Sequence, residues 1–186
     1  MTDRSLESTA TLIEKLRGGE QAARERLVER CFPLLRRWAH GRLPGYARDL
    51  ADTDDMVQVT LLRALRNIER IDASRPGSFL AYLRTILLNA VRDEIRKSSR
   101  RPLRYPLDDA GVATESTLSR STAFETLDAY ERALEALPEH LRQAVILRVE
   151  FGMTFSEVAL ELGIPSANAA RMQVSRALVK VAEAMP

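Results

Sequence analysis

The stretch GIPSANAARMQVSRALVK, residues 163–180, decides the fold of this chain. It begins with a glycine, a proline and a serine, and then continues with the composition of a helix. It carries the cations Arg171, Arg176 and Lys180 and no acid. A short helix that is cationic on one side and apolar on the other, entered through a tight turn, is typical of the second helix of a helix-turn-helix. The first helix of the pair is then expected over residues 154–162.

The turn between these two helices has the residue types that a helix-turn-helix requires. Ala159 lies where the helices are expected to cross, so that its small side chain permits close approach. Gly163 follows four residues later, where the turn favours positive φ. Ile164 is expected to fill the turn, and Ser166 to cap the second helix. The inner face of that helix is predicted to consist of Ala169, Ala170 and Met172.

The outer face of the second helix combines side chains that read DNA bases with side chains that hold phosphates. Arginine pairs with guanine, and asparagine or glutamine with adenine, in the major groove. Serine and lysine bind phosphates. A helical hairpin whose arginines are merely solvated is the alternative interpretation. The DNA-binding interpretation assigns this face to Ser166, Asn168, Arg171, Gln173, Ser175, Arg176 and Lys180.

Apolar residues recur three and four positions apart almost throughout the chain of 186 residues, which predicts an all-α fold. Residues 102–123 contain two prolines, one glycine and many serines and threonines, a composition typical of a linker. Residues 105–135 contain seven acids and two arginines, a net charge of −5. We therefore expect two small helical domains, residues 1–101 and 124–186, joined by a flexible acidic linker. Helices are expected over 5–17, 20–43, 78–99, 124–137, 138–151, 154–162 and 166–184, and from an N-cap at Thr53 or Asp54 to Ile71.

The helix expected over residues 78–99 is the longest, and its sequence has two faces. The core face is predicted to hold Phe79, Leu80, Leu83, Ile86, Leu87, Ala90, Val91 and Ile95. A polar face is predicted to hold Tyr82, Thr85, Asn89, Arg92, Arg96 and Arg100.

Composition and single residues argue against several classes of protein. The net charge is only +2, so an interaction with nucleic acid has to depend on where the charges lie. Cys31 is the one cysteine and is expected to be a small buried hydrophobe in a cytoplasmic protein. His40 and His140 have no partner at metal-ligand spacing, and no phosphate-binding loop is present, so we expect no catalysis, cofactor or metal. The apolar runs are short, so no membrane insertion is expected.

Three further segments, taken with residues 163–180, resemble the extracytoplasmic-function (ECF) sigma factors, the smallest members of the bacterial sigma-70 family. DTDDMVQVTLLRALRNI (52–68) is similar to the helix of that family that binds core RNA polymerase. GSFLAYLRTILLNAVRDEIRKSSRR (77–101) is similar to the promoter-melting segment. ALEALPEHLRQAVILRVEFGMTFSEVALELGIP (133–165) is similar to the segment that grips the polymerase flap and opens the helix-turn-helix. The resemblance covers about residues 10–183, and departures at Met56, Val59, Leu88 and Asn168–Ala170 indicate a divergent subgroup.

The resemblance implies a sigma factor that binds core RNA polymerase and promoter DNA, with an anti-sigma factor as a further partner, in the bacterial cytoplasm and on the nucleoid when in holoenzyme. It implies contacts with the β′ clamp helices through residues 54–68 and with the β flap through residues 138–151. The outer face of the 166–180 segment then reads the distal promoter element. The polymerase-binding residues are predicted to be Asp55, Met56, Gln58, Val59, Leu62, Arg63 and Arg66. The residues at the proximal, melted element are predicted to be Arg75, Ser78, Tyr82, Thr85, Asn89, Arg92, Asp93, Arg96 and Arg100.

Two alternatives accompany this prediction. In the alternative interpretation of single residues, Tyr82 is a half-buried core ring with a solvated hydroxyl, and Asn89 and Asp93 are parts of a solvated helix face. At the level of the whole protein, the alternative is a stand-alone helix-turn-helix regulator that binds operator DNA. That regulator would be a dimer, because such units usually bind paired half-sites. No third domain or heptad zipper that would form a dimer is visible in the sequence.

Overall fold

The computed structural model describes residues 7–43, 50–72, 75–100 and 125–185. Within these ranges every regular element is helical, as the spacing of apolar residues predicted. The predicted linker, residues 102–123, lies outside the described residues.

The N-terminal half consists of α1 (Thr9–Arg17), α2 (Gln21–Arg42), α3 (Leu50–Arg66), the short 3₁₀ helix η2 (Ile68–Arg70) and α4 (Ser78–Arg100). Ser8 caps α1, because its hydroxyl accepts a hydrogen bond from the backbone N–H of Thr11 at 3.2 Å. Gly19 follows α1 with φ of 91°, a conformation that favours glycine. The predicted bounds of α1, α2 and α4 therefore agree with the structure to within a few residues.

The helix α3 differs from its prediction at both ends. Thr53 or Asp54 was expected to cap it, but the helix already includes Leu50, and Thr53 is fully buried inside it. Its last helical residue is Arg66, and η2 continues the chain toward Ile71. The acids of this segment thus lie within the helix and do not mark its start.

The C-terminal half begins with a helix over residues 125–135 and continues through α6 (Glu139–Val145), η3 (Ile146–Glu150), α7 (Phe155–Leu162) and α8 (Ala167–Ala184). The predicted helix over 138–151 is therefore an α-helix that widens into the π-helical turn η3.

The helix-turn-helix of α7 and α8 is confirmed, and its local chemistry is as predicted. Thr154 and Glu157 form a capping box at the start of α7, with their reciprocal bonds at 3.2 and 2.7 Å. Gly163 ends α7 in the left-handed conformation, with φ of 63°. The Ser166 hydroxyl accepts from the N–H of Ala169 at 3.1 Å and caps α8.

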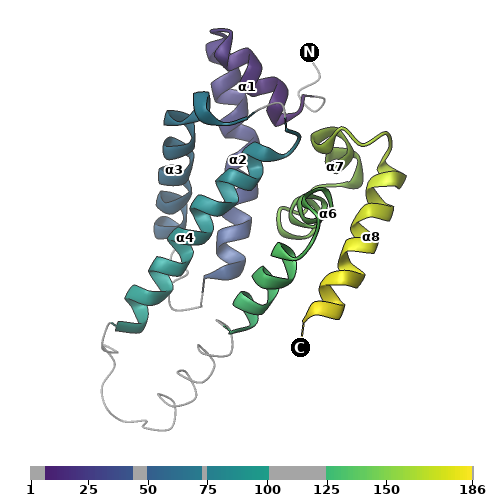
Figure 1. Ribbon diagram of the computed structural model, residues 1–186. Coiled ribbons are helices and arrows are strands. Elements are labelled where there is room, and N and C mark those ends of the chain that lie inside the picture. The colour runs from purple at the N-terminus through teal and green to yellow at the C-terminus, as the bar shows by residue number, and fades with distance from the viewer. Residues whose placement is uncertain (1–6, 44–49, 73–74, 101–124, 186) are drawn as a thin grey trace.

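The two halves pack against each other, as Figure 1 shows. In that view α7 lies near α1, and α6 lies between the N-terminal helices and α8, which is on the outer side. The buried apolar side chains of both halves form one continuous core. Leu35, Trp38 and Phe79 belong to its N-terminal part, and Leu147 and Phe151 to its C-terminal part.

Candidate polymerase and nucleic-acid interfaces

The outer face of α3 carries the predicted polymerase-binding residues. Val57, Leu61 and Ala64 bury the opposite side of the helix in the core. Val59 and Leu62 are 45% and 48% exposed, although both are large and apolar. Six of the predicted residues are exposed on this outer face, and the seventh, Met56, is half-buried against the core; the six are Asp55, Gln58, Val59, Leu62, Arg63 and Arg66.

The outer face of α8 carries the predicted distal DNA-binding residues. Ala170, Val174 and Ala177 recur three and four residues apart and bury the other side of the helix. The Asn168 side-chain oxygen accepts a hydrogen bond from the Arg171 guanidinium at 3.0 Å, so the two side chains lie together on the surface. The predicted residues that are exposed are Ser166, Asn168, Arg171, Ser175, Arg176 and Lys180, while Gln173 is half-buried.

Met172 corrects one sequence prediction. It was assigned to the inner face of α8, but it is 45% exposed. The buried stripe is set by Ala170, Val174 and Ala177, which places position 172 on the opposite side of an α-helix. Met172 therefore lies among the candidate DNA-binding side chains, beside Arg171 in the sequence.

The start of α4 borders a cavity of about 440 Å³. Arg75, Ser78 and Tyr82 line it from the N-terminal half. Glu139 and Gln143 of α6 line it from the C-terminal half. The Tyr82 ring is half-buried and packs against the core, as the core interpretation expects. It also faces this cavity, so part of the ring is accessible, as the DNA-binding interpretation requires.

The remaining predicted residues of α4 lie along its polar side. Asp93 and Arg96 are exposed and pair with each other at 3.6 Å. Arg92 differs, because it is half-buried and its guanidinium lies 3.2 Å from the Asp128 carboxylate of the 125–135 helix. Thr85 and Asn89 are exposed, and the side chain of Arg100 lies outside the described residues.

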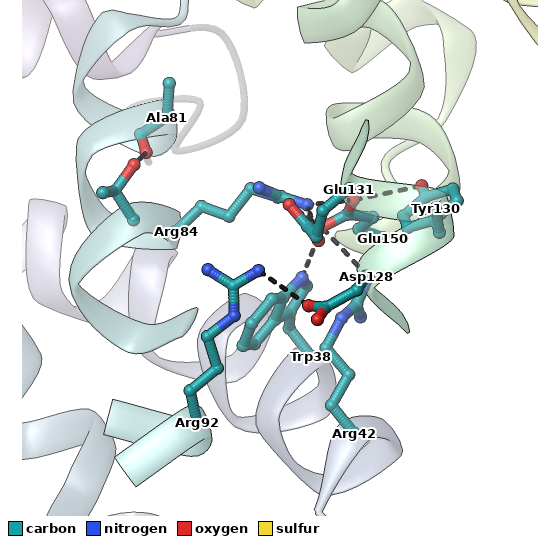
Figure 2. A network of polar contacts seen from close by, with 10 residues as sticks. Trp38, Arg42, Ala81, Arg84, Arg92, Asp128, Tyr130, Glu131 and Glu150 are labelled. Carbon is teal, nitrogen blue, oxygen red and sulfur yellow. Dashed lines mark hydrogen bonds and ion pairs between the residues drawn. The ribbon is translucent and has the colours of Figure 1, made fainter. Parts of the chain in front are cut away.

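Sequence reasoning missed a polar network between the two halves, which we name the central network. It consists of the charged side chains Arg42, Arg84, Glu131 and Glu150, and of Trp38 and Tyr130, which donate hydrogen bonds to Glu150. Figure 2 shows Arg84 of α4 reaching into a set of acids on the C-terminal half. Its guanidinium donates to Glu150 at 2.7 and 2.8 Å and to Glu131 at 2.6 Å. The Trp38 indole N–H also donates to Glu150, and Arg42 lies 3.2 Å from the same carboxylate.

Glu150 is the centre of this network, and its surroundings keep it charged. Burial alone raises the pKa of its carboxyl group, but the hydrogen bond and charge of Arg84 and the charge of Arg42 lower it more, so the pKa lies below its ordinary value. Burial and the charge of Glu150 together raise the pKa of Tyr130, whose hydroxyl donates to Glu150 at 3.1 Å. The network is thus an ionised carboxylate surrounded by donors.

A second buried contact, the Glu161 contact, joins α7 to α1 and α2. The Glu161 side chain is fully buried. It accepts hydrogen bonds from the Thr9 backbone N–H at 3.0 Å and from the Thr9 hydroxyl at 2.6 Å. The Arg30 guanidinium pairs with it at 2.6 Å.

A signal for these acids was present in the sequence. Glu150 follows Ile146 and Leu147 by four and three residues, and Glu161 follows Val158 by three. These spacings place both glutamates on the apolar stripe of their segments, where a charge needs a partner. The identity of that partner was not available from local spacing.

Two classes of site are not found in the part of the chain that the structure describes. Among those residues no cluster of histidine, cysteine, aspartate or glutamate is arranged to hold a metal ion. No helix there is long and apolar enough to span a bilayer.

Comparison with known proteins matches both halves to one family. The model of Sigma-70 region 2 matches residues 27–101, and the model of Sigma-70, region 4 matches residues 127–181. The chain is 35% identical to "Probable RNA polymerase sigma factor RfaY" of Xanthomonas campestris, over 72% of this chain and only 34% of that relative. It is 36% identical to "ECF RNA polymerase sigma factor EcfG" of Rhodopseudomonas palustris, over 69% and 68% of the two chains. It is 32% identical to "RNA polymerase sigma factor CarQ" of Myxococcus xanthus, over 92% and 94%.

These matches cover α3, the two-faced α4 and the helix-turn-helix in the order in which the sequence presents them. They favour a sigma factor over a stand-alone operator-binding regulator. Members of this family are non-enzymatic initiation factors that bind core RNA polymerase and promoter DNA. The chain therefore belongs to the sigma-70 family, as an ECF-type RNA polymerase sigma factor that directs promoter-specific initiation of transcription.

Proposed function

We propose that the outer face of α3, within residues 54–68, binds the β′ clamp helices of core RNA polymerase. The observation that carries this proposal is the exposure of Val59 and Leu62, at 45% and 48%, on a helix whose other side is anchored in the core. Apolar side chains flanked by Asp55 and Arg63 form the mixed surface that a protein interface requires.

We further propose that residues 138–151 contact the β flap. Val149 supports this assignment, because it is 50% exposed on η3 between residues that are otherwise buried or half-buried. The neighbouring Arg148 is held in place, since its guanidinium donates to the Met153 carbonyl at 2.7 Å and lies over the Phe155 ring at 4.5 Å. The segment thus presents an apolar side chain on a fixed backbone.

In the proposed holoenzyme, α8 enters the major groove of the distal promoter element, and α4 holds the melted proximal element. The exposed polar side chains of α8 follow a well-formed N-cap, which is the geometry of a recognition helix. At the proximal element the Tyr82 ring is placed to stack on an unpaired base, an interaction worth about 1–3 kcal/mol.

The domain boundaries that we propose are residues 1–101 and 124–186, with 102–123 between them. The protein acts in the cytoplasm, joins the nucleoid as part of the holoenzyme, and leaves all bond formation to the polymerase. An anti-sigma factor is a further proposed partner.

Size-exclusion chromatography with bacterial core polymerase, in moderate salt and without DNA, tests the proposal. The wild-type protein should co-elute with the polymerase, and a smaller fraction of the double variant Asp55→Ala/Gln58→Ala should co-elute. Glu25→Ala is the matched control, because it also removes an exposed polar side chain, but from α2, and it should co-elute as the wild type does. Undiminished affinity in the double variant would contradict the assignment of α3.

A reciprocal variant separates DNA recognition from docking. Arg171→Ala should bind the polymerase normally and lose discrimination among promoters, because Arg171 is exposed on α8 far from α3 in the fold. Transcription of all promoters at wild-type levels would contradict the role of α8. A dimer that shifts DNA without polymerase would instead favour an operator-binding regulator.

A further inference from the structure

The first two turns of α8 carry a hydrogen-bonded pair of side chains, Asn168 and Arg171. Asn168 is the second residue of the helix after the Ser166 cap, and Arg171 is the fifth. Both are exposed, and the Asn168 Oδ1 atom accepts a hydrogen bond from Nη2 of Arg171 at 3.0 Å. In a recognition helix the N-terminal residues are the ones that reach base edges in the major groove. The pair therefore lies where the proposed contact with DNA bases is made.

The chemistry of the pair defines which amide atom of Asn168 faces the arginine. A guanidinium has five N–H donors and no acceptor, so the Asn168 atom toward it has to be the oxygen. A bidentate contact with adenine needs the oxygen and the nitrogen of the amide side by side at one base. Asn168 instead turns its oxygen along the helix toward Arg171. This arrangement favours a role of Asn168 toward Arg171 over direct reading of adenine.

Arg171 keeps a complete edge for a base while Asn168 holds it. The N–H groups of a guanidinium form two edges of two parallel donors, and Nη2 contributes one hydrogen to each edge. The bond to Asn168 uses one hydrogen of Nη2, so the other edge keeps both donors. Two parallel donors match the O6 and N7 acceptors of guanine in the major groove, which is the commonest base-specific contact of arginine.

Asn168 orients the arginine without neutralising it. Residues 162–182 contain no aspartate or glutamate, so the segment offers Arg171 no carboxylate partner. A carboxylate at position 168 would also hold the guanidinium, but it would add a negative charge where DNA phosphates approach. The amide oxygen leaves the full positive charge of Arg171 for DNA. Asn168 belongs to the stretch Asn168–Ala170 that departs from the usual residues of the family, so the resemblance to the family does not imply this pair.

Holding Arg171 in advance strengthens its contact with a base. An arginine that is mobile in the free protein loses rotamer freedom when a base immobilises it, and that loss weakens the contact by about two- to tenfold. An arginine already held by Asn168 has less freedom to lose. Its two remaining parallel donors are also aimed at one place, so a base without two acceptors there leaves a donor unpaired.

We propose that Asn168 is a positioning residue that holds Arg171 toward one guanine of the distal promoter element, and that the two side chains read this base as a unit. The inference rests on the proposed entry of α8 into the major groove. It deepens that proposal by naming the base and the residue that acts through Arg171. The distal element then contains a guanine at the position that faces Arg171, and Asn168 recognises no adenine.

Selection of bound duplexes by the holoenzyme tests this assignment. Core polymerase loaded with the full chain is incubated with a pool of duplexes randomised at both promoter elements, and the bound fraction is sequenced. The wild type should select guanine at one distal position. Arg171→Ala should lose this preference, and Asn168→Ala should reduce it about two- to tenfold at the same position only. The double variant should resemble Arg171→Ala, because Asn168 acts through Arg171.

Two further variants separate positioning of the arginine from reading of a base by Asn168 itself. Asn168→Asp keeps an oxygen acceptor and loses the amide donors, so it should retain the preference for guanine while binding all duplexes more weakly. Glu183→Ala, an exposed change in the last turn of α8, is the matched control and should select the same bases as the wild type. Loss of the guanine preference in Asn168→Asp, or a changed preference at a second position in Asn168→Ala, would overturn the proposal.

Modified bases in a selected duplex identify the contact. 7-Deazaguanine, which lacks the N7 acceptor, should weaken binding of the wild type severalfold and leave Arg171→Ala unaffected. Inosine keeps O6 and N7 and should be bound as guanine is. Equal binding of guanine and 7-deazaguanine by the wild type would overturn the assignment of guanine to Arg171.

The same selection distinguishes this inference from the proposed role of α8. If Arg171→Ala changes the base preference and Asn168→Ala does not, the positioning role of Asn168 is wrong while the role of α8 stands. If neither variant changes the preference at any distal position, the proposed entry of α8 into the major groove is wrong, and the inference is overturned with it.

Discussion

Replacing Glu150 by glutamine should lower the free energy of unfolding by about 3–5 kcal/mol. The Glu150 carboxylate accepts two hydrogen bonds from Arg84, at 2.7 and 2.8 Å, and lies 3.2 Å from Arg42. Glutamine has nearly the same shape, but one of its ends is a donor that would face the arginine donors. Both arginines would also lose the charge that offsets their burial, so the variant leaves uncompensated charge inside the protein.

Urea unfolding followed by tryptophan fluorescence measures this change. Trp38 is the one tryptophan of the chain, and its indole N–H donates to Glu150, so the signal reports on the network itself. Glu157→Gln is the matched control, because glutamine also completes a capping box and the expected loss is below about 1 kcal/mol. A loss below about 1 kcal/mol in Glu150→Gln as well would refute the argument that the buried charge holds the halves together.

The pH dependence of the same comparison has a defined sign. The pKa of Glu150 in the folded protein lies below its ordinary value. The stabilisation from Glu150 is therefore fully present when the pH is above the ordinary pKa of glutamate. It is lost as pH falls through the lowered pKa. The difference in unfolding free energy between wild type and Glu150→Gln should therefore shrink on acidification, and a difference that grew would contradict this assignment.

Three further changes have expected outcomes. Gly163→Ala should lower stability by about 1 kcal/mol in thermal unfolding, because no atom lies within 4 Å of the added Cβ and only the left-handed backbone opposes it; a neutral result would mean that the turn relaxes. We expect the exposed thioether of Met172 to contact the 5-methyl group of thymine in the major groove. Wild-type holoenzyme should therefore bind distal elements with thymine more tightly than the same elements with uracil, whereas Met172→Ala holoenzyme should bind both equally well. No preference for thymine in the wild type would exclude Met172 from base recognition. Cys31 should react with a thiol reagent at mildly alkaline pH only on unfolding, because burial and the charge of Glu161 raise its pKa. Fast labelling of the native protein would contradict the packing of α7 against α2.

The parts of the fold that local chemistry specifies were predictable from the sequence. Ala159, Gly163 and Ser166 define the helix-turn-helix within a few residues of each other, and the structure has each in its predicted place. The stripe of Val57, Leu61 and Ala64 likewise fixed which side of α3 faces the core. In these segments the determining contacts lie one helical turn apart, which is the range that periodicity reports.

The parts that depend on distant residues were not predictable. Arg84 and Glu150 are 66 positions apart, and Thr9 and Glu161 are 152 apart, so no spacing rule connects them. The error at Met172 has a local cause. Because methionine is apolar and lies between Ala170 and Val174 in the sequence, it was assigned to the buried side, although position 172 is on the opposite side of the helix from both. The inclusion of residues 50–53 in α3 was missed because Thr53 and the acids Asp54 and Asp55 also suit a helix N-terminus.

The arginines of the interface have a consequence for ionic strength. Arg30, Arg42 and Arg84 each lie against a glutamate that is at most 7% exposed. Salt screens charge pairs in solvent strongly, whereas buried pairs are screened much less. The contact between the halves should therefore persist over the range of salt concentrations at which exposed arginines lose their attraction for DNA phosphates.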